Sequence, residues 1–228
     1  MNSREAILNK IRAANQTPSI MNVDNPGVEQ KIQEGIVSVT PEDLWGQFKA
    51  EFELISGKFY SVIGVEKATD LVSEFISENK YNKIGTSGEE ICESAIKKVQ
   101  EHSPKLKVVS SANLSFEERK QEFASIELSV VHPSFVVADI GALVFLYNKT
   151  GTSLPHFLCD NTFALVKREQ IVANQFELFE KLSVEDSKNM VFVAGPSRTA
   201  DIEKILVLGA HGPRNLTVIL VNENYPAI

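Results

Sequence analysis

The sequence predicts an α/β protein with a mostly parallel sheet and helices on both faces of that sheet. Short apolar runs of strand length alternate with longer amphipathic segments, which is the pattern of βαβ units. The chain has 228 residues, of which 43% are hydrophobic, so it can bury one sizeable α/β core. These two observations favour a single α/β domain.

The expected elements follow this alternation. A helix is expected from Thr40 on, because Thr40 can cap its first turn and Pro41 suits that turn. The segment 135–139 fits a helix or a strand, and its periodicity does not decide between them. Further along the chain, strands are expected at 59–65, 83–85, 106–109, 128–131, 142–146, 163–166, 190–193 and 216–221, and helices at 69–78, 88–99, 116–123, 169–182 and 199–206.

The N-terminal part is expected to lie outside this fold. Residues 3–14 have the period of an amphipathic helix, whereas residues 16–39 are largely polar, contain two prolines and have no sustained period. We therefore expect an N-terminal helix and linker at 1–40 and the α/β domain at 41–228.

Charge, hydropathy and cysteine content narrow the functional classes. The net charge is −7 and the basic residues are scattered, so nucleic acid is not an expected partner. No apolar stretch is long enough to span a bilayer and the first residues lack a signal-peptide core, so we expect a cytoplasmic protein. Cys92 and Cys159 have no CxxC partner and are expected to be buried thiols. We accordingly expect no metal or cofactor bound by this chain itself.

The strongest candidate ligand site is the segment VFVAGPSRTADIE at 191–203. If a helix follows the Gly-Pro turn, its free N–H groups and the hydroxyls of Ser197 and Thr199 can hold a carboxylate or phosphate beyond the strand's carboxyl end. Arg198 would add a bidentate contact to that anion. Alternatively, Ser197 or Thr199 only caps the helix and Asp201 only complements its dipole.

A second candidate is LGAHGPR at 208–214. Gly212 and the following proline force a turn, which would bring His211 back toward the first motif. His211 is then either an acid/base or carboxylate ligand near Arg198, or a turn residue whose ring is satisfied locally.

The third candidate is VADIGALVF at 137–145. Asp139 stands between apolar residues, and Gly141 permits close approach of another backbone. A partly buried carboxylate has a pKa set by its surroundings, as catalytic acids often do. The alternative is that Asp139 accepts backbone N–H bonds in a tight turn.

Together with SLP at 153–155, these motifs resemble the signature of the LUD-domain family of the lactate utilization protein C type. The resemblance extends over about residues 41–228 and is most specific at GPSRTADIE and LGAHGP. The chain departs from the family at Ile140 and Ala142, where the family usually carries hydroxyl residues.

The resemblance implies a fold similar to the ribose-5-phosphate isomerase and CoA-transferase group. It also implies an accessory or anion-binding part in oxidising L-lactate to pyruvate, beside partner proteins that carry iron–sulfur clusters. Asp139 and His211 are the candidates for catalysis, and the candidates for binding a small carboxylate or phosphate are Ser197, Arg198, Thr199, Asp201, Gly141 and Gly212. Two other hypotheses remain open: a free-standing enzyme on phosphorylated or CoA-linked small molecules, and an interaction protein whose loops only cap helices.

Overall fold

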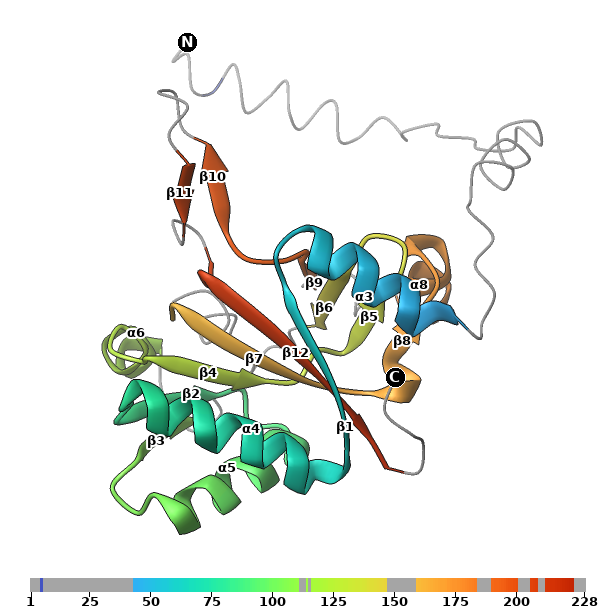
Figure 1. Cartoon of the computed structure of the whole chain (residues 1–228). Helices are drawn as coiled ribbons and strands as arrows, with labels where there is room; N and C mark the ends of the chain where they lie inside the picture. The colour runs from blue at the N-terminus through green and yellow to red at the C-terminus, as the bar shows by residue number, and fades with distance from the viewer. Residues whose placement is uncertain are drawn as a thin grey trace, which may run out of the picture. The chain divides into compact units, whose positions relative to one another are not determined.

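The computed structural model divides the chain into two compact units, Met1–Ser38 and Val39–Ile228. It describes residues 5, 43–110, 114, 116–146, 159–183, 190–200, 206–208 and 212–223 (Figure 1). The linker, the Thr40 cap and, apart from Glu5, the helix expected at 3–14 lie outside these residues. Within the described part, no helix combines the length and the apolar character that crossing a membrane requires.

All eight predicted strands are present among the described residues, three of them at the predicted bounds (β4, β6 and β9). The observed elements of the second unit are α3 (Leu44–Leu54), β1 (Lys58–Ile63), α4 (Gly64–Asn79), β2 (Lys83–Thr86), α5 (Glu90–His102), β3 (Lys107–Ser110), α6 (Phe116–Phe123), β4 (Leu128–Val131), β5 (Phe135–Val137), β6 (Ala142–Leu146), β7 (Asn161–Lys167), the 3-10 helix η3 (Arg168–Gln170), β8 (Ile171–Val172), α8 (Gln175–Lys181), β9 (Met190–Val193), β10 (Arg198–Ala200), β11 (Leu206–Leu208) and β12 (Asn215–Asn222).

Six strands form one sheet in the order β1-β12-β7-β4-β2-β3, and every pair of neighbours in it is parallel. The connections from β1 to β2 and from β2 to β3 run toward one edge, whereas the connection from β3 to β4 runs back. Because such crossovers are right-handed, connections in opposite directions place their helices on opposite faces. The predicted α/β fold class is therefore confirmed.

The central strands contribute side chains to two apolar cores, one on each face of the sheet, because successive residues of a strand point to opposite faces. In β7, Phe163 and Leu165 pack with α4 and α5, whereas Ala164 and Val166 pack with α3. This is the period of two expected for a strand buried on both faces. Helices consequently cover both faces, with α4 and α5 on one and α3 on the other (Figure 1).

A second sheet, not foreseen as such, shares the core beneath α3. Its order is β8-β5-β6-β9, with β6 antiparallel to both β5 and β9. Leu143 and Val193 from this sheet join Phe48 and Phe52 of α3 in one apolar cluster. The undecided segment 135–139 is resolved as strand β5. In strand β9 only Val193 is buried, because the strand lies at the edge of this second sheet.

The helix predicted at 199–206 is wrong. Strand β10 instead pairs antiparallel with β11, with Arg198 opposite Leu208 and Ala200 opposite Leu206. Thr199 and Val207 are β-branched and suit this pairing better than a helix. A short apolar run has no period that separates the two structures, so pairing with the next strand along the chain decides.

The helix predicted at 169–182 is wrong in its first part. Helix α8 begins at Gln175, where the side chain of Asn174 accepts a hydrogen bond from the N–H of Glu177 (3.0 Å). The carboxylate of Glu177 accepts in return from the N–H of Ala173 (2.7 Å). This reciprocal capping ends the preceding strand β8 and starts the helix.

Candidate functional site

Two glycines of the predicted motifs meet against the C-terminal half of α3. Strands β6 and β9 are antiparallel, and continuing their register past the strand ends places Gly141 opposite Gly195. Both have a positive φ, 57° and 95°. A Cβ on Gly141 would lie 2.7 Å from the backbone N of Phe52, and one on Gly195 would lie 2.8 Å from Ile55 Cδ1. Close approach to α3 therefore requires glycine at both positions.

Two other motifs meet through the backbone. The N–H of Ser197 donates a hydrogen bond to the carbonyl of Pro213 (2.8 Å). Gly212, beside that proline, is buried. The bond joins the segments GPSRT and HGPR, which the sequence analysis expected to lie close together. We call residues 139–141, 194–197 and 212–213 the signature loops.

The helix-based argument for an anion site fails, because no helix begins after Ser197. The signature loops also lie at a different edge of the sheet from the one expected. Strand β9 belongs to the four-stranded sheet, and Pro213 precedes the amino end of β12, not the carboxyl end of a parallel strand. The structure gives no description of four predicted site side chains: Arg198, Thr199, Asp201 and His211.

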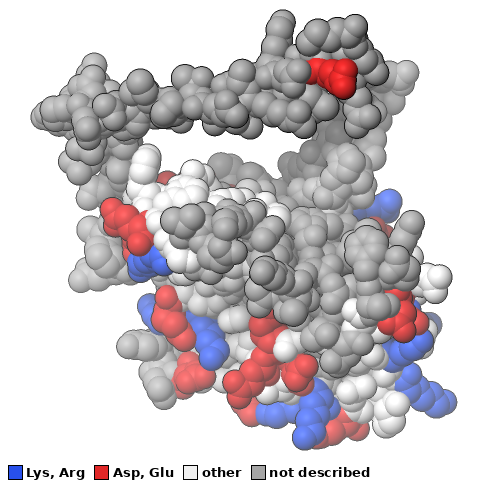
Figure 2. All heavy atoms as spheres, turned by 180° about the vertical axis from the view of Figure 1, so that it is seen from behind, with Lys and Arg blue, Asp and Glu red and all other residues white. Residues whose placement is uncertain are grey.

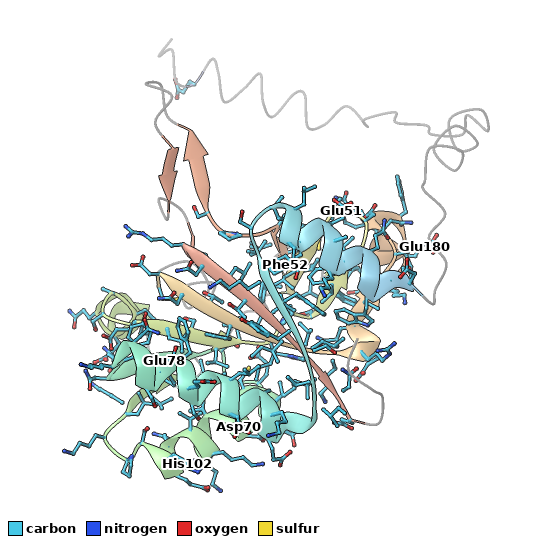
Figure 3. All side chains as sticks on the ribbon, viewed as in Figure 1. Glu51, Phe52, Asp70, Glu78, His102 and Glu180 are labelled. Carbon is cyan, nitrogen blue, oxygen red and sulfur yellow. The ribbon has the colours of Figure 1, made fainter. Side chains whose placement is uncertain are left out.

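Asp139 lies in the turn between β5 and β6, close enough to Glu51 of α3 to feel its charge. Its N–H donates to the carbonyl of Ala173 (3.1 Å), and one carboxylate oxygen, Oδ1, is buried with no hydrogen-bond partner among the described residues. Burial raises the pKa of Asp139, and so does the carboxylate of Glu51, against the lowering effect of nearby backbone N–H groups. Figure 3 labels Glu51 and Phe52 on α3. The loop thus combines a turn with a carboxyl whose pKa is shifted by its surroundings.

The carboxyl edge of the parallel sheet is filled by polar groups that bond to one another. His132 Nδ1 lies 2.7 Å from the carbonyl of Leu165, and its Nε2 lies 3.2 Å from the amide nitrogen of Gln170. The amide oxygen of Gln170 accepts from the N–H of Lys167 (2.6 Å). Sequence analysis missed this network, although His132 directly follows the strand predicted at 128–131.

The same edge continues through a second network. Arg168 donates to the amide oxygen of Asn222 (3.3 Å), and the amide nitrogen of Asn222 donates to Ser61 Oγ (2.9 Å). In the turn before α5, Thr86 Oγ1 accepts from the N–H of Gly88 (3.2 Å). Most of the described polar groups at this edge therefore satisfy one another, whereas Ser110 Oγ at the end of β3 is buried without a partner among the described residues.

The amino edge carries a polar recess of about 310 Å³ instead. Sequence analysis missed it, although the asparagines that open β7 and β12 are an unusual start for apolar strands and were a usable signal. It is lined by Lys58, Phe75, Asn79, Tyr81, Asp160, Asn161, Thr162, Phe163, Arg214, Asn215 and Thr217. Arg214 belongs to the predicted LGAHGPR motif, so the recess adjoins the signature loops.

Cys92 and Cys159 are both buried and free, as predicted, and burial raises the pKa of each thiol. Among the described residues, no three side chains of His, Cys, Asp or Glu are grouped as metal ligands. On the face shown in Figure 2, described Lys and Arg side chains are interspersed with Asp and Glu.

The LUD domain family matches residues 46–221, and the chain belongs to this family. A relative named lactate utilization protein C, from Bacillus pumilus (strain SAFR-032), is 23% identical over 96% of this chain and 97% of its own. A relative of the same name from Deinococcus radiodurans is 39% identical over 27% of this chain and 30% of its own. A solved duf162 family protein from Deinococcus radiodurans is similar in fold, with a TM-score of 0.56 at 15% identity, over 81% of this chain and 99% of that one.

Proposed function

We propose that the chain is a component of a lactate-utilization system and acts in it as an accessory subunit that binds a small anion. The observation that carries the proposal is family membership, joined to a full-length relative that is named lactate utilization protein C. The convergence of Gly141, Ser197 and Gly212 in the signature loops supports a shared binding role for these motifs.

In this role the anion would be held by the signature loops rather than by a helix N-terminus. The proposed binding residues are Ser197, Arg198, Thr199, Asp201, Gly141 and Gly212. Asp139 and His211 are the proposed proton-handling groups, and the pKa of Asp139, which burial raises, supports this because catalytic acids often have a pKa shifted by their surroundings.

We further propose that electron transfer belongs to partner proteins with iron–sulfur clusters, and that the complex is cytoplasmic. The chain has two cysteines and both are buried, which is too few for a cluster held by cysteine thiolates.

Deletion of the gene tests the proposal directly. We expect the deletion strain to lose growth on L-lactate but not on glucose, and the wild-type gene to restore it. Arg198→Ala should restore growth poorly, while the surface control Lys97→Ala should restore it fully. A tagged chain purified from lactate-grown cells should retain iron-containing partners by elemental analysis. Normal growth of the deletion strain on L-lactate would contradict the proposal.

The alternative is a free-standing enzyme on phosphorylated or CoA-linked small molecules with Asp139 as its acid. The buried, unpartnered Oδ1 of Asp139 favours it. This alternative requires the purified chain alone to turn over such a substrate, with loss of activity in Asp139→Asn. Retention of activity only in the assembled complex excludes it.

A further inference from the structure

We propose that the recess at the amino edge of the six-stranded sheet binds a small monocarboxylate between Lys58 and Arg214. The inference rests on the proposed anion-binding function, but it places the bound carboxylate in the recess beside the signature loops, as an alternative to the loops themselves. The observations that carry it are the position of the recess, its buried polar lining and two cations that have no full partner.

The recess lies where three strands begin side by side. Lys58, the first residue of β1, pairs with Thr217 of β12, and Asn215 of β12 pairs with Asn161 of β7. Figure 1 shows these three strands adjacent in the sheet. The volume of about 310 Å³ lies at the lower end of the range of about 300–1,000 Å³ that is typical of small-molecule sites.

Buried polar side chains concentrate at this recess. Seven polar residues of the described part are buried, and three of them line it: Asn161, Thr162 and Thr217, at 8%, 2% and 6% exposure. Burial of polar groups costs free energy unless they are hydrogen-bonded, and Asn161 finds partners in Tyr81 and Asn215. These side chains line the recess with hydrogen-bonding atoms that suit a polar ligand rather than an apolar one.

A hydrogen-bond chain orients one donor toward the ligand. Asn215 donates through its amide nitrogen to Asn161 Oδ1 (2.9 Å), and Asn161 donates to the hydroxyl oxygen of Tyr81 (2.8 Å). Because that oxygen accepts from Asn161, the hydroxyl proton of Tyr81 is left to donate. Burial, with the carboxylates of Glu127 and Asp160, raises the pKa of Tyr81, so the group stays protonated at neutral pH.

Two cations at the recess lack full partners, although the chain has a net charge of −7. The ammonium group of Lys58 makes no hydrogen bond or ion pair with any described residue. Arg214 contacts Asp160 Oδ1 only through Nε (3.4 Å), and its terminal nitrogens have no partner within the described part of the chain. Two cations and one carboxylate among the lining residues leave an excess of one positive charge, which suits an anion.

The charges around the recess favour a monoanion over a phosphate dianion. An adjoining cavity shares Lys58 and Phe75 with the recess and is also lined by Glu74 and Glu78. Figure 3 shows Glu78 at the C-terminal end of α4, which carries the negative pole of the helix dipole. These charges oppose a second negative charge on the ligand, so the recess suits a carboxylate that also offers a hydroxyl or carbonyl oxygen to Tyr81.

The experiment is a titration of the full-length chain by calorimetry and protein-observed NMR, with L-lactate, pyruvate and inorganic phosphate as probes. We expect at least one monocarboxylate to bind more tightly than phosphate. Lys58→Ala and Arg214→Ala should each weaken it about tenfold or more, the effect of losing one charged hydrogen bond. Lys97→Ala removes an exposed lysine of α5 that lines neither cavity, and should leave binding unchanged.

Three outcomes overturn the proposal. The first is no binding of either carboxylate by folded protein, and the second is equal weak binding of all three anions. The third is binding that is lost in Arg198→Ala but retained in Lys58→Ala, which would place the ligand in the signature loops. Failure of the recess leaves the growth phenotype on L-lactate intact, so it is distinguishable from failure of the proposed function.

Discussion

The two edges of the parallel sheet differ in how their polar groups are satisfied. At the carboxyl edge, His132, Gln170 and the Arg168–Asn222 pair bond to one another and to backbone atoms. At the amino edge, Lys58 and the terminal nitrogens of Arg214 face a recess without a described partner. The general rule for open parallel sheets places ligands at the carboxyl edge. In this chain, the cations that lack a full partner lie at the amino edge, so we favour a ligand site at that edge instead.

The difference has a structural origin. The second sheet continues directly from β4 and β7, so the chain leaving the carboxyl edge folds back beneath α3 and ties that edge together. Gln170, between β7 and β8, bonds to the segment between β4 and β5. At the amino edge, Tyr81 in the loop that enters β2, Asp160 before β7 and Arg214 before β12 surround the recess.

The largest effect on stability is expected for Gly141→Ala, which tests whether the backbone of α3 fixes the conformation of the signature loops. Alanine would adopt a positive φ of 57° and place its Cβ 2.7 Å from the N of Phe52. We expect a loss of about 2–4 kcal/mol in the free energy of unfolding, measured by urea denaturation. The control Gly64→Ala has a similar φ of 79° but meets only the side chain of Glu66, at 3.1 Å, and should lose less. Equal losses would show that α3 does not constrain the loop.

Gln170→Ala tests the carboxyl edge as a structural network. The substitution leaves the N–H of Lys167 and the ring of His132 without their partner, so we expect a loss of about 2–3 kcal/mol. Binding of carboxylates should not change. Gln100→Ala, which removes one long bond to Leu106 (3.4 Å), is the matched control and should cost about 0.5 kcal/mol. A binding defect in Gln170→Ala would instead place a ligand at the carboxyl edge.

Asn161→Ala is the corresponding change at the amino edge. Tyr81 and Asn215 lose a partner, but water in the recess can replace it, so we expect only about 1–2 kcal/mol. Thermal denaturation together with carboxylate titration separates the two effects, because loss of binding should exceed loss of stability. A larger stability loss than that of Gln170→Ala would reverse the comparison of the edges.

The smallest effect is expected for Asp139→Asn, through its pH dependence. The folded-state pKa of Asp139 is raised, chiefly by burial, so ionisation of this carboxyl destabilises the fold. Relative to the variant, the wild type should therefore lose stability as pH rises from below the usual aspartate pKa through the folded value, by less than about 1 kcal/mol. Urea denaturation of both proteins at pH 3 to 7 measures this. A relative gain by the wild type over that range would mean that hydrogen bonds to the ionised carboxylate dominate.

Sequence alone determined the parallel sheet, its α/β alternation and the motifs that converge. The apolar runs that became β4, β6, β7 and β12 are long and continuous enough to identify strands without knowing their partners. The requirement for glycine at 141 also followed from the sequence, because the motif predicted a close backbone approach that α3 then provided.

Only the tertiary structure decided the hairpin at β10 and β11, the second sheet and the edge at which polar groups remain unpaired. Strand β10 has no intrinsic preference strong enough to resist pairing, so partners six to ten residues further along the chain set its conformation. Lys58, Tyr81, Asn161 and Arg214 are distant in sequence and share a recess only because parallel strands align their amino ends. A local sequence pattern shows which residues of a helix or strand are buried. The order of the strands decides which distant side chains meet in a recess, and no local pattern specifies that order.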